Sequence, residues 1–368
     1  MTQQKINPAV AQDIGHVAYS IIVPVYNRPD EVDELLESLT HQTMKGFEVI
    51  IVEDGSQRPC ADVCKKYEGS LDLHYYAKPN SGPGQSRNYG VERAKGDYVI
   101  ILDSDVIVPE EYIEAIDREL KNQPADAFGG PDRAHPDFTP TQKAISYSMT
   151  SFFTTGGIRG GKKKLDKFYP RSFNMGVRRD VYHKLGGFSK MRFGEDIDFS
   201  IRIFKGGYSC RLFPDAWVYH KRRTDFRKFW RQVFNSGIAR INLYKKYPDS
   251  LKLVHLLPAV FTVGVFFLLA LFIAGPILGH TVIKAYLDPD PPVGGLISMA
   301  ALLPLLLYSL LILIDSTISN RSLKIGLLSV RAAFTQLLGY GCGFLQAWWR
   351  RCVGKDAEYE AYKDNFYK

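Results

Sequence analysis

The sequence predicts an α/β domain with a mostly parallel central sheet, followed by a C-terminal α-helical membrane region. Between residues 19 and 122, short apolar runs alternate with amphipathic runs, the rhythm of a parallel sheet covered by helices on both faces. Beyond residue 250 there are two apolar runs, each long enough for the roughly 20 residues that span a bilayer. Polar residues follow several predicted strands, so we expect a ligand site at the carboxyl edge of the sheet.

The elements of the α/β domain follow from the periodicity of apolar side chains. Strands are expected over residues 19–27, 47–56, 71–77 and 97–102. Helices are expected over residues 30–43, 82–96 and 109–122. The last of these helices is expected to start at Pro109, because proline suits the first turn of a helix.

Two aspartates end the strand in GDYVIILDSD, residues 96–105. In an extended chain, residues two apart point the same way, so Asp103 and Asp105 would project together with Ser104 facing away. Like charges this close are unfavourable unless a cation lies beside them. A solvated turn is the alternative, but acid or amide groups also follow the strands that end near Asn27 and Glu53, which favours a common site.

Composition narrows the function classes. The formal net charge of +8 suits an anionic partner such as a phosphorylated ligand or a lipid surface. No helix-turn-helix, zinc-finger or RNP-like pattern is present, so no nucleic acid partner is expected. The five scattered cysteines lack metal spacing and indicate reduced thiols, and the polar first twenty residues do not resemble a secretory signal.

The C-terminal part divides into a basic amphipathic region and apolar segments. Arginines and lysines flank an apolar stripe in the region 222–250, which indicates an interfacial helix, although the stripe could instead pack on its own domain. Transmembrane helices are expected over 251–279 and 293–314, and 326–349 is left open as a re-entrant, interfacial or third transmembrane helix. Basic residues around these segments predict a cytoplasmic catalytic domain and a cytoplasmic tail at 350–368.

Four motifs in series resemble the family 2 glycosyltransferases of GT-A fold. They are SIIVPVYNRPDEVDELLESLTHQT, VEDGS, GPGQSRNYGVERAKGDYVIILDSD and FGEDIDFSIRIFKGGY. The resemblance covers about residues 18–245, which predicts a GT-A nucleotide-binding domain at 18–221 after a polar leader at 1–17. It implies transfer of a sugar from a nucleotide diphosphate donor to an acceptor, with inversion of the anomeric carbon and with a divalent cation.

The resemblance also implies a set of metal ligands. Asp103 and Asp105 would hold a hard divalent cation, Mg²⁺ or Mn²⁺ rather than zinc, which neutralises the departing diphosphate. His220 falls where many such enzymes have a third metal or phosphate contact, although a histidine satisfied within the protein is an equal alternative.

The nucleotide sugar is expected to contact several of the residues at the strand ends. Glu53 stands where the family has the first aspartate of Asp-Asp-Gly-Ser, which leaves open whether the base is uracil or guanine. Arg87 and Asn88 suit the diphosphate and ribose, with a surface ion pair as the alternative for Arg87. The other expected nucleotide-sugar contacts are Pro24, Tyr26, Asn27, Asp54, Asp103 and Ser104.

The catalytic residues are expected in GEDIDFSIR, residues 194–202. Asp196 is the preferred base for the acceptor hydroxyl, and Glu195 is either an acceptor-binding partner or the base itself. Asp198 could cap the following helix or pair with Arg202, and an exposed acid-rich helix start is the alternative for the whole segment.

The sequence therefore predicts a metal-dependent, membrane-anchored inverting glycosyltransferase in a bacterial-type inner membrane. Its acceptor would be a lipid-linked saccharide or another glycan of cell-envelope synthesis. GGIRGGKK, residues 156–163, departs from the phosphate-loop pattern and is expected to be a basic loop that closes over donor or acceptor. The alternatives are a polyprenyl-phosphate glycosyltransferase and an inactive membrane scaffold that binds nucleotide sugar.

Overall fold

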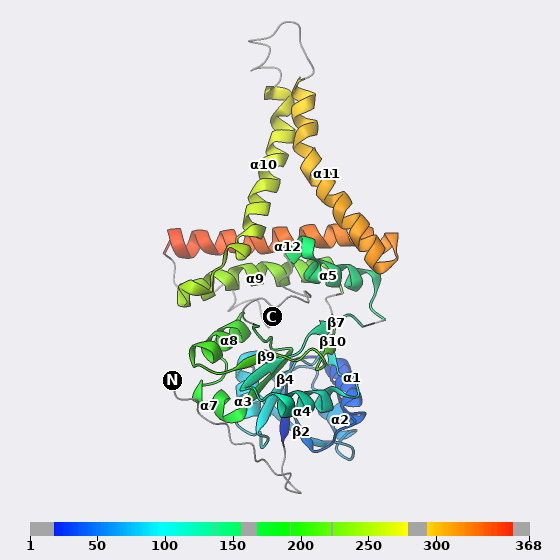
Figure 1. The fold of residues 1–368 in the computed structure, drawn as a ribbon, viewed down its shortest axis with the longest axis vertical. Helices are drawn as coiled ribbons and strands as arrows, with labels where there is room; N and C mark the ends of the chain where they lie inside the picture. The colour runs from blue at the N-terminus through cyan, green and yellow to red at the C-terminus, as the bar shows by residue number, and fades with distance from the viewer. Residues whose placement is uncertain are drawn as a thin grey trace. The chain divides into compact units, whose positions relative to one another are not determined.

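The computed structural model describes residues 18–135, 137–155, 168–191, 193–221, 224–278 and 293–355. The chain forms two compact units (Figure 1). The sheet unit comprises Met1–Arg133, Phe168–Met191 and Glu195–His220, and the helical unit comprises Ala134–Lys167, Arg192–Gly194 and Lys221–Lys368. The expected leader at 1–17, the basic loop at 156–163 and most of the tail at 350–368 lie outside the described residues.

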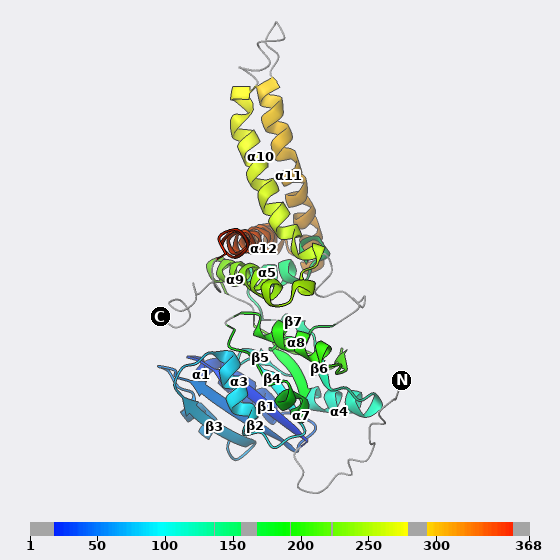
Figure 2. The same cartoon turned by 90° about the vertical axis from the view of Figure 1, so that its left-hand side faces the viewer.

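The sheet unit contains a seven-stranded sheet in the order β3-β2-β1-β4-β8-β6-β9 (Figure 2). Its strands are β1 (Tyr19–Val25), β2 (Phe47–Asp54), β3 (Asp72–Lys78), β4 (Tyr98–Leu102), β6 (Ala127–Gly129), β8 (Asn174–Arg178) and β9 (Cys210–Leu212). Parallel pairing joins β3, β2, β1 and β4, whereas β8 is antiparallel to both β4 and β6. The predicted α/β class with a mostly parallel sheet is therefore confirmed.

Apolar side chains cover both faces of this sheet, which is why its central strands read as nearly continuous apolar runs. The helices of the unit are α1 (Pro29–Thr40), α2 (Ala61–Lys65), α3 (Pro83–Val91), α4 (Tyr112–Asn122), α7 (Arg179–Lys184) and α8 (Glu195–Lys205). Ile21 on β1 belongs to a buried cluster with side chains of α1 and α4. Its neighbour Ile22 belongs to a second cluster with α3, α7 and α8. The alternation along β1 therefore directs successive side chains into two separate cores.

A small second sheet was not expected from the sequence. Strand β5 (Val106–Ile107) pairs antiparallel with β10 (Val218–His220), which also pairs with β7 (Asp132–Arg133). His220 lies opposite Val106 in this register, directly beside the acidic end of β4. The expected helix start at Pro109 is wrong by three residues, because Pro109 instead forms a turn whose carbonyl accepts from the Tyr112 amide.

In the helical unit, the last α-helix of the described residues, α12 (Leu323–Trp348), lies beside α9 (Phe226–Lys246) with small residues between them. The helices of this unit are α5 (Pro140–Thr150), α6 (Phe152–Thr155), α9, α10 (Leu257–Leu278), α11 (Val293–Asn320) and α12, with 3₁₀ turns at Pro248–Ser250 and Leu253–His255 and a π turn at Trp349–Val353. A Cβ atom added to Gly237 of α9 would lie 2.1 Å from the Tyr340 carbonyl oxygen, and one on Gly343 of α12 would lie 2.0 Å from that of Phe234. These glycines allow the two backbones to approach closely, as in small-residue helix interfaces.

Two helices of the described residues are long and apolar enough to cross a membrane. These are Leu253–Leu278 and Gly294–Asn320, with mean hydropathies of 2.7 and 2.5. In each case the side chains of the apolar window are mostly exposed, with 17% and 11% buried. Figure 1 shows α12 crossing the base of the α10–α11 pair and running beside α9. Much of the apolar stripe of α9 is buried against α12, and the interfacial position expected for 222–250 stays a prediction.

Gly176 on β8 gives a test of packing in the sheet. A Cβ atom there would lie 2.0 Å from the Phe128 ring, which itself stacks on Phe213 with centroids 4.6 Å apart. We expect Gly176→Ala to destabilise the protein by about 1–3 kcal/mol, because overpacking displaces that ring. The measurement is the thermal unfolding midpoint of the purified chain. Gly69→Ala, where nothing lies within 4 Å of the added carbon, is the matched control, and an equal shift in both variants would contradict the packing argument.

Candidate functional site

The candidate site lies at the carboxyl edge of the parallel strands. Strands β1, β2 and β4 run in the same direction, so the residues that follow them meet at one edge. Asn27 follows β1, Asp54 ends β2, and Asp103 follows β4. The predicted meeting of these residue groups at one sheet edge follows from the observed topology.

Asp103, Asp105 and His220 form a group that can hold a metal ion. One ligand atom from each lies within 4.8 Å of the other two. His220 Nε2 is 3.3 Å from an Asp105 carboxylate oxygen, and its ring stacks on Phe173 with centroids 4.8 Å apart. The Nδ1 atom of His220 is buried and makes no hydrogen bond. Two carboxylates with one imidazole suit Mn²⁺ well and Mg²⁺ less well, because magnesium prefers oxygen ligands throughout. Ser104 and Asp105 lie in a turn, not in the extended chain that was expected, and both are buried. The expected contact of Ser104 with the donor stays a prediction.

Two arginines neutralise this acidic pair in the structure. The Arg28 guanidinium donates to Asp105 at 2.6 Å, and Arg87 donates to Asp103 at 2.8 Å. Arg87 is almost completely buried and also donates to Glu195 at 3.0 Å. The alternative of a surface ion pair for Arg87 is therefore wrong. One buried guanidinium instead connects the end of β4 to the first turn of α8.

Glu195 and Asp196 start α8, and their side chains are held differently. Burial raises the pKa of Glu195 to about 7; the neighbouring Asp196 charge adds to this rise, and the Arg87 charge opposes it. Burial works to raise the pKa of Asp196, but Arg171 at 2.6 Å, the Ile197 amide and the Arg87 charge together hold this pKa below its ordinary value. Both acids are buried, so the expected alternative of an exposed acidic helix start is wrong. Asp198 pairs with Arg202 at 2.8 Å, one of the two roles expected for it.

Asn27 and Glu53 organise the loop that follows β2. Asn27 adopts a positive φ of 56°, and its side-chain oxygen accepts from the backbone amides of Gln57 and Arg58 at 2.7 and 3.0 Å. Glu53 is buried, and its carboxylate accepts from the Ser56 hydroxyl and, at 2.7 Å, from the Cys60 amide. Both side chains therefore shape the rim of the site, and their expected contacts with the nucleotide stay predictions.

Asp54 and Asn88 have similar structural roles. The Asp54 carboxylate accepts from the backbone amides of Ser81 and Gly82 at 2.9 and 2.8 Å, and the Lys78 ammonium also donates to it. The Asn88 amide donates to the Phe188 carbonyl at 2.9 Å and its oxygen accepts from the Phe188 amide at 2.8 Å. The loops before α3 and after α7 are thus fixed at the site. Contacts of Asp54, Asn88 and the half-buried Pro24 and Tyr26 with a donor stay predictions.

Arg28 and Arg171 were not singled out from the sequence, yet each binds an acid of the site. Arg28 directly follows Asn27, a predicted contact of the nucleotide sugar, and this position in the sequence could have identified it as a site residue. Arg171 lies in a segment without a recognisable pattern. Its pairing with Asp196, 25 residues later, depends on the fold alone.

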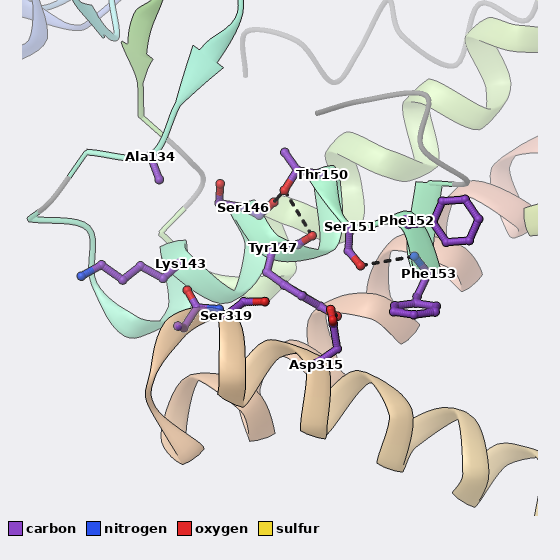
Figure 3. Close-up of a pocket in the computed structure, with 11 residues that line it drawn as sticks. Ala134, Lys143, Ser146, Tyr147, Thr150, Ser151, Phe152, Phe153, Asp315 and Ser319 are labelled. Carbon is purple, nitrogen blue, oxygen red and sulfur yellow. Dashed lines mark hydrogen bonds between the residues drawn. The ribbon is translucent and has the colours of Figure 1, made fainter. Parts of the chain in front are cut away.

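The helical unit has a separate pocket of about 390 Å³ between α5 and α11 (Figure 3). The Tyr147 hydroxyl donates to the Asp315 carboxylate there, and Figure 3 shows the two side chains pointing toward one another. Burial raises the pKa of Tyr147, and its hydrogen bond to Asp315 adds to the rise. The pocket combines these polar groups with the exposed rings of Phe152 and Phe153.

Comparisons with known proteins show which family the N-terminal half of the chain resembles. Residues 20–186 match the profile described as glycosyl transferase family 2. A glycosyltransferase named AglE from Haloferax volcanii is 25% identical over 250 residues, which cover 67% of this chain and 80% of that protein. An uncharacterized glycosyltransferase from Rickettsia felis is 37% identical over 111 residues, 29% of this chain and 18% of its own length. The chain thus spans less than a fifth of this last relative.

A solved structure shows the same fold. The mannosyltransferase PcManGT from Pyrobaculum calidifontis, solved in complex with GDP-Man and Mn²⁺, aligns with a TM-score of 0.55 and 16% identity. The alignment covers 91% of this chain and 88% of that chain. At this identity the similarity concerns the fold, and it confirms the GT-A class.

The raised pKa of Glu195 predicts a pH dependence of stability. An acid with a folded-state pKa of about 7 against an ordinary 4.5 favours the folded state while it is protonated. This contribution, on the order of 3 kcal/mol, is fully present below pH about 4.5 and is lost as the pH rises through about 7. We expect the unfolding midpoint of Glu195→Gln to rise relative to that of wild type as the pH increases from 5 to 8. Glu68→Gln, at an exposed position, serves as control; a difference that is independent of pH would contradict the assignment.

Proposed function

We propose that the chain, whose residues 20–186 match the glycosyl transferase family 2 profile, transfers a sugar from a nucleotide diphosphate donor to a lipid-linked saccharide or another glycan acceptor. The proposal includes inversion at the anomeric carbon, dependence on a divalent cation, and attachment to a bacterial-type inner membrane with the catalytic domain in the cytoplasm. The observation that carries it is the Asp103–Asp105–His220 group at the carboxyl edge, connected through Arg87 to Glu195.

The donor end of the site fits a departing diphosphate. A divalent cation bound by Asp103, Asp105 and His220 would supply Lewis-acid stabilisation of the negative charge that develops on the leaving group. Arg28 pairs with Asp105 and Arg87 pairs with Asp103, so both carboxylates are oriented before any donor binds. PcManGT, which shares the fold, is described in complex with GDP-Man and Mn²⁺, and this supports a nucleotide sugar and Mn²⁺ or Mg²⁺ here.

Asp196 is our candidate for the base that takes the acceptor proton. Its pairing with Arg171 and its hydrogen bond from the Ile197 amide at 2.8 Å keep it ionised and fixed in direction. Glu195 is held by Arg87 and acts in this proposal as a positioning residue beside the acceptor. Inversion requires the base to lie on the sugar face opposite the leaving group.

A lipid-linked acceptor is supported by the helical unit. Two exposed apolar helices of membrane-spanning length follow the basic helix α9, so the chain has the means to remain at a bilayer. Direct transfer to polyprenyl phosphate is the second candidate within the class, supported by the same helices. A scaffold without catalysis is the third, and the intact acids Asp103, Asp105 and Asp196 argue against it.

Metal and ligand dependence give the first test of the function. We expect membranes that contain the full chain to transfer label from a suitable nucleotide sugar into lipid-linked saccharide, and EDTA to abolish transfer until Mn²⁺ or Mg²⁺ is restored. Asp105→Asn should lower the rate by on the order of 100-fold or more, because several kcal/mol of charge stabilisation are lost. Asp62→Asn, at an exposed position, is the control.

Three outcomes would contradict parts of this proposal. Sugar transfer that continues in EDTA would contradict the proposed dependence on a divalent cation. A labelled polyprenyl phosphate sugar, formed without any lipid-linked saccharide, would favour the second candidate. Donor binding without transfer to any acceptor of a panel would favour the scaffold.

The identity of the base gives a second test. If Asp196 is the base, kcat/KM should show no acidic limb above pH 5, because the pKa of this acid is lowered. If Glu195 is the base, kcat/KM should fall tenfold per pH unit below about 7. We expect the first profile, together with a loss of 100-fold or more in kcat for Asp196→Asn. A smaller loss for Asp196→Asn than for Glu195→Gln would reverse the two roles.

A further inference from the structure

Three side chains of types that can bind a metal ion meet at the amino edge of the sheet, opposite the edge that carries the candidate site. Glu48 near the start of β2 lies opposite Asp72 at the start of β3, and His74 follows two residues later on β3. Residues opposite one another in a parallel pair project from the same face, as do residues two apart. At about 3.3 Å per residue, Glu48 lies roughly 20 Å along β2 from Asp54. This group is therefore separate from the candidate glycosyltransferase site.

The distances within the group resemble those between ligands of one metal ion. His74 Nε2 is 3.4 Å from a Glu48 oxygen and 3.2 Å from an Asp72 oxygen. One ligand atom from each of the three residues lies within 4.8 Å of the others. A tetrahedral ion with bonds of about 2.0–2.1 Å separates its ligand atoms by about 3.3–3.4 Å. Two edges of the group therefore already have the length that such an ion requires.

The buried carboxylate of Glu48 supplies an independent observation. Its Oε1 atom accepts from the Ser20 hydroxyl and from the Lys95 amide, both at 2.6 Å. Its Oε2 atom, the oxygen 3.4 Å from His74 Nε2, accepts no hydrogen bond, and the Glu48 side chain is completely shielded from solvent. A buried carboxylate oxygen that accepts no hydrogen bond is costly, so it indicates a missing ligand.

His74 shows the same deficiency from the other side. Its Nε2 atom lies beside two carboxylates and makes a hydrogen bond to neither. A protonated histidine that served only as an ion-pair partner would direct its N–H at one of these oxygens. An imidazole nitrogen that faces the space between two carboxylates instead has the arrangement of a metal ligand.

We propose that Glu48, Asp72 and His74 form a structural binding site for a divalent transition metal ion, with Zn²⁺ the best fit. One imidazole with two carboxylates favours such an ion over Mg²⁺ or Ca²⁺, which prefer oxygen ligands throughout. Asp72 and His74 remain partly exposed, at 51% and 31% of their side chains, so an ion and a completing water can enter. The ion would fasten β3, an edge strand of the sheet, to β2.

The test measures bound zinc on the full chain in detergent. Asp105→Asn is present in every sample, and excess Mg²⁺ is added, so that the candidate donor site does not contribute. After equilibrium dialysis against micromolar Zn²⁺, elemental analysis should find one zinc per chain. His74→Ala should lower the affinity for Zn²⁺ by about 100-fold or more. Loss of a residue that only hydrogen-bonds to a metal ligand can already cost roughly 100-fold. His41→Ala is the matched control, because His41 also pairs with an acid, Glu37, but both side chains are more than half exposed.

A second measurement keeps the proposal testable if a variant folds poorly. Zn²⁺ should raise the unfolding midpoint of the Asp105→Asn chain and of its His41→Ala derivative, but not that of its His74→Ala or Asp72→Asn derivatives. No zinc bound to the parent chain, or equal zinc and equal shifts in the His74→Ala derivative, would overturn the proposal. Because neither readout involves sugar transfer, the result is independent of the proposed enzyme function.

Discussion

The buried guanidinium of Arg87 is the interaction on which the candidate site depends. It donates to Asp103 at the end of β4 and to Glu195 at the start of α8, two residues 92 positions apart. A charge this deeply buried is stable only with charged partners, and the two carboxylates likewise need it. The parts of the site that would bind the donor and the acceptor therefore share one cation and are stabilised together.

The polar residues around the sheet edge divide into two sets. The side chains of Asn27, Glu53, Asp54 and Asn88 are engaged by backbone amides of the adjoining loops. Asp103, Asp105, Glu195 and Asp196 are instead held by arginine or histidine side chains. The first set makes the rim rigid, and the second leaves charged groups oriented for chemistry. A rigid rim reduces the reorganisation that catalysis requires.

The helices of the helical unit differ in how much of their apolar surface they bury. The two helices of membrane-spanning length, α10 and α11, expose most of their side chains, whereas α9 and α12 bury many of theirs against one another. Glycines at Gly237, Gly339 and Gly343 permit that close contact. Such packing needs small residues more than it needs apolar ones, and it gives the unit a compact base beside the exposed pair.

The sequence by itself determined the local features of this protein. Continuous apolar runs predicted the parallel strands, and the spacing of Asp103 and Asp105 predicted that the two acids would lie close together. These features depend on neighbours a few residues apart, which periodicity reveals. The three-residue error at Pro109 is also local, because proline suits a turn as well as a helix start.

Only the tertiary structure decided the partners of the charged groups. Arg171 pairs with Asp196, Arg28 with Asp105, and Glu48 faces His74, and none of these pairs has a sequence pattern. The segment 326–349, left open by the sequence, packs through Gly339 and Gly343 against α9 and through Gly341 against α10. Burial sets whether a carboxylate is protonated, paired or able to bind a metal. Burial in turn depends on segments far apart in the chain, whose approach is a property of the complete fold.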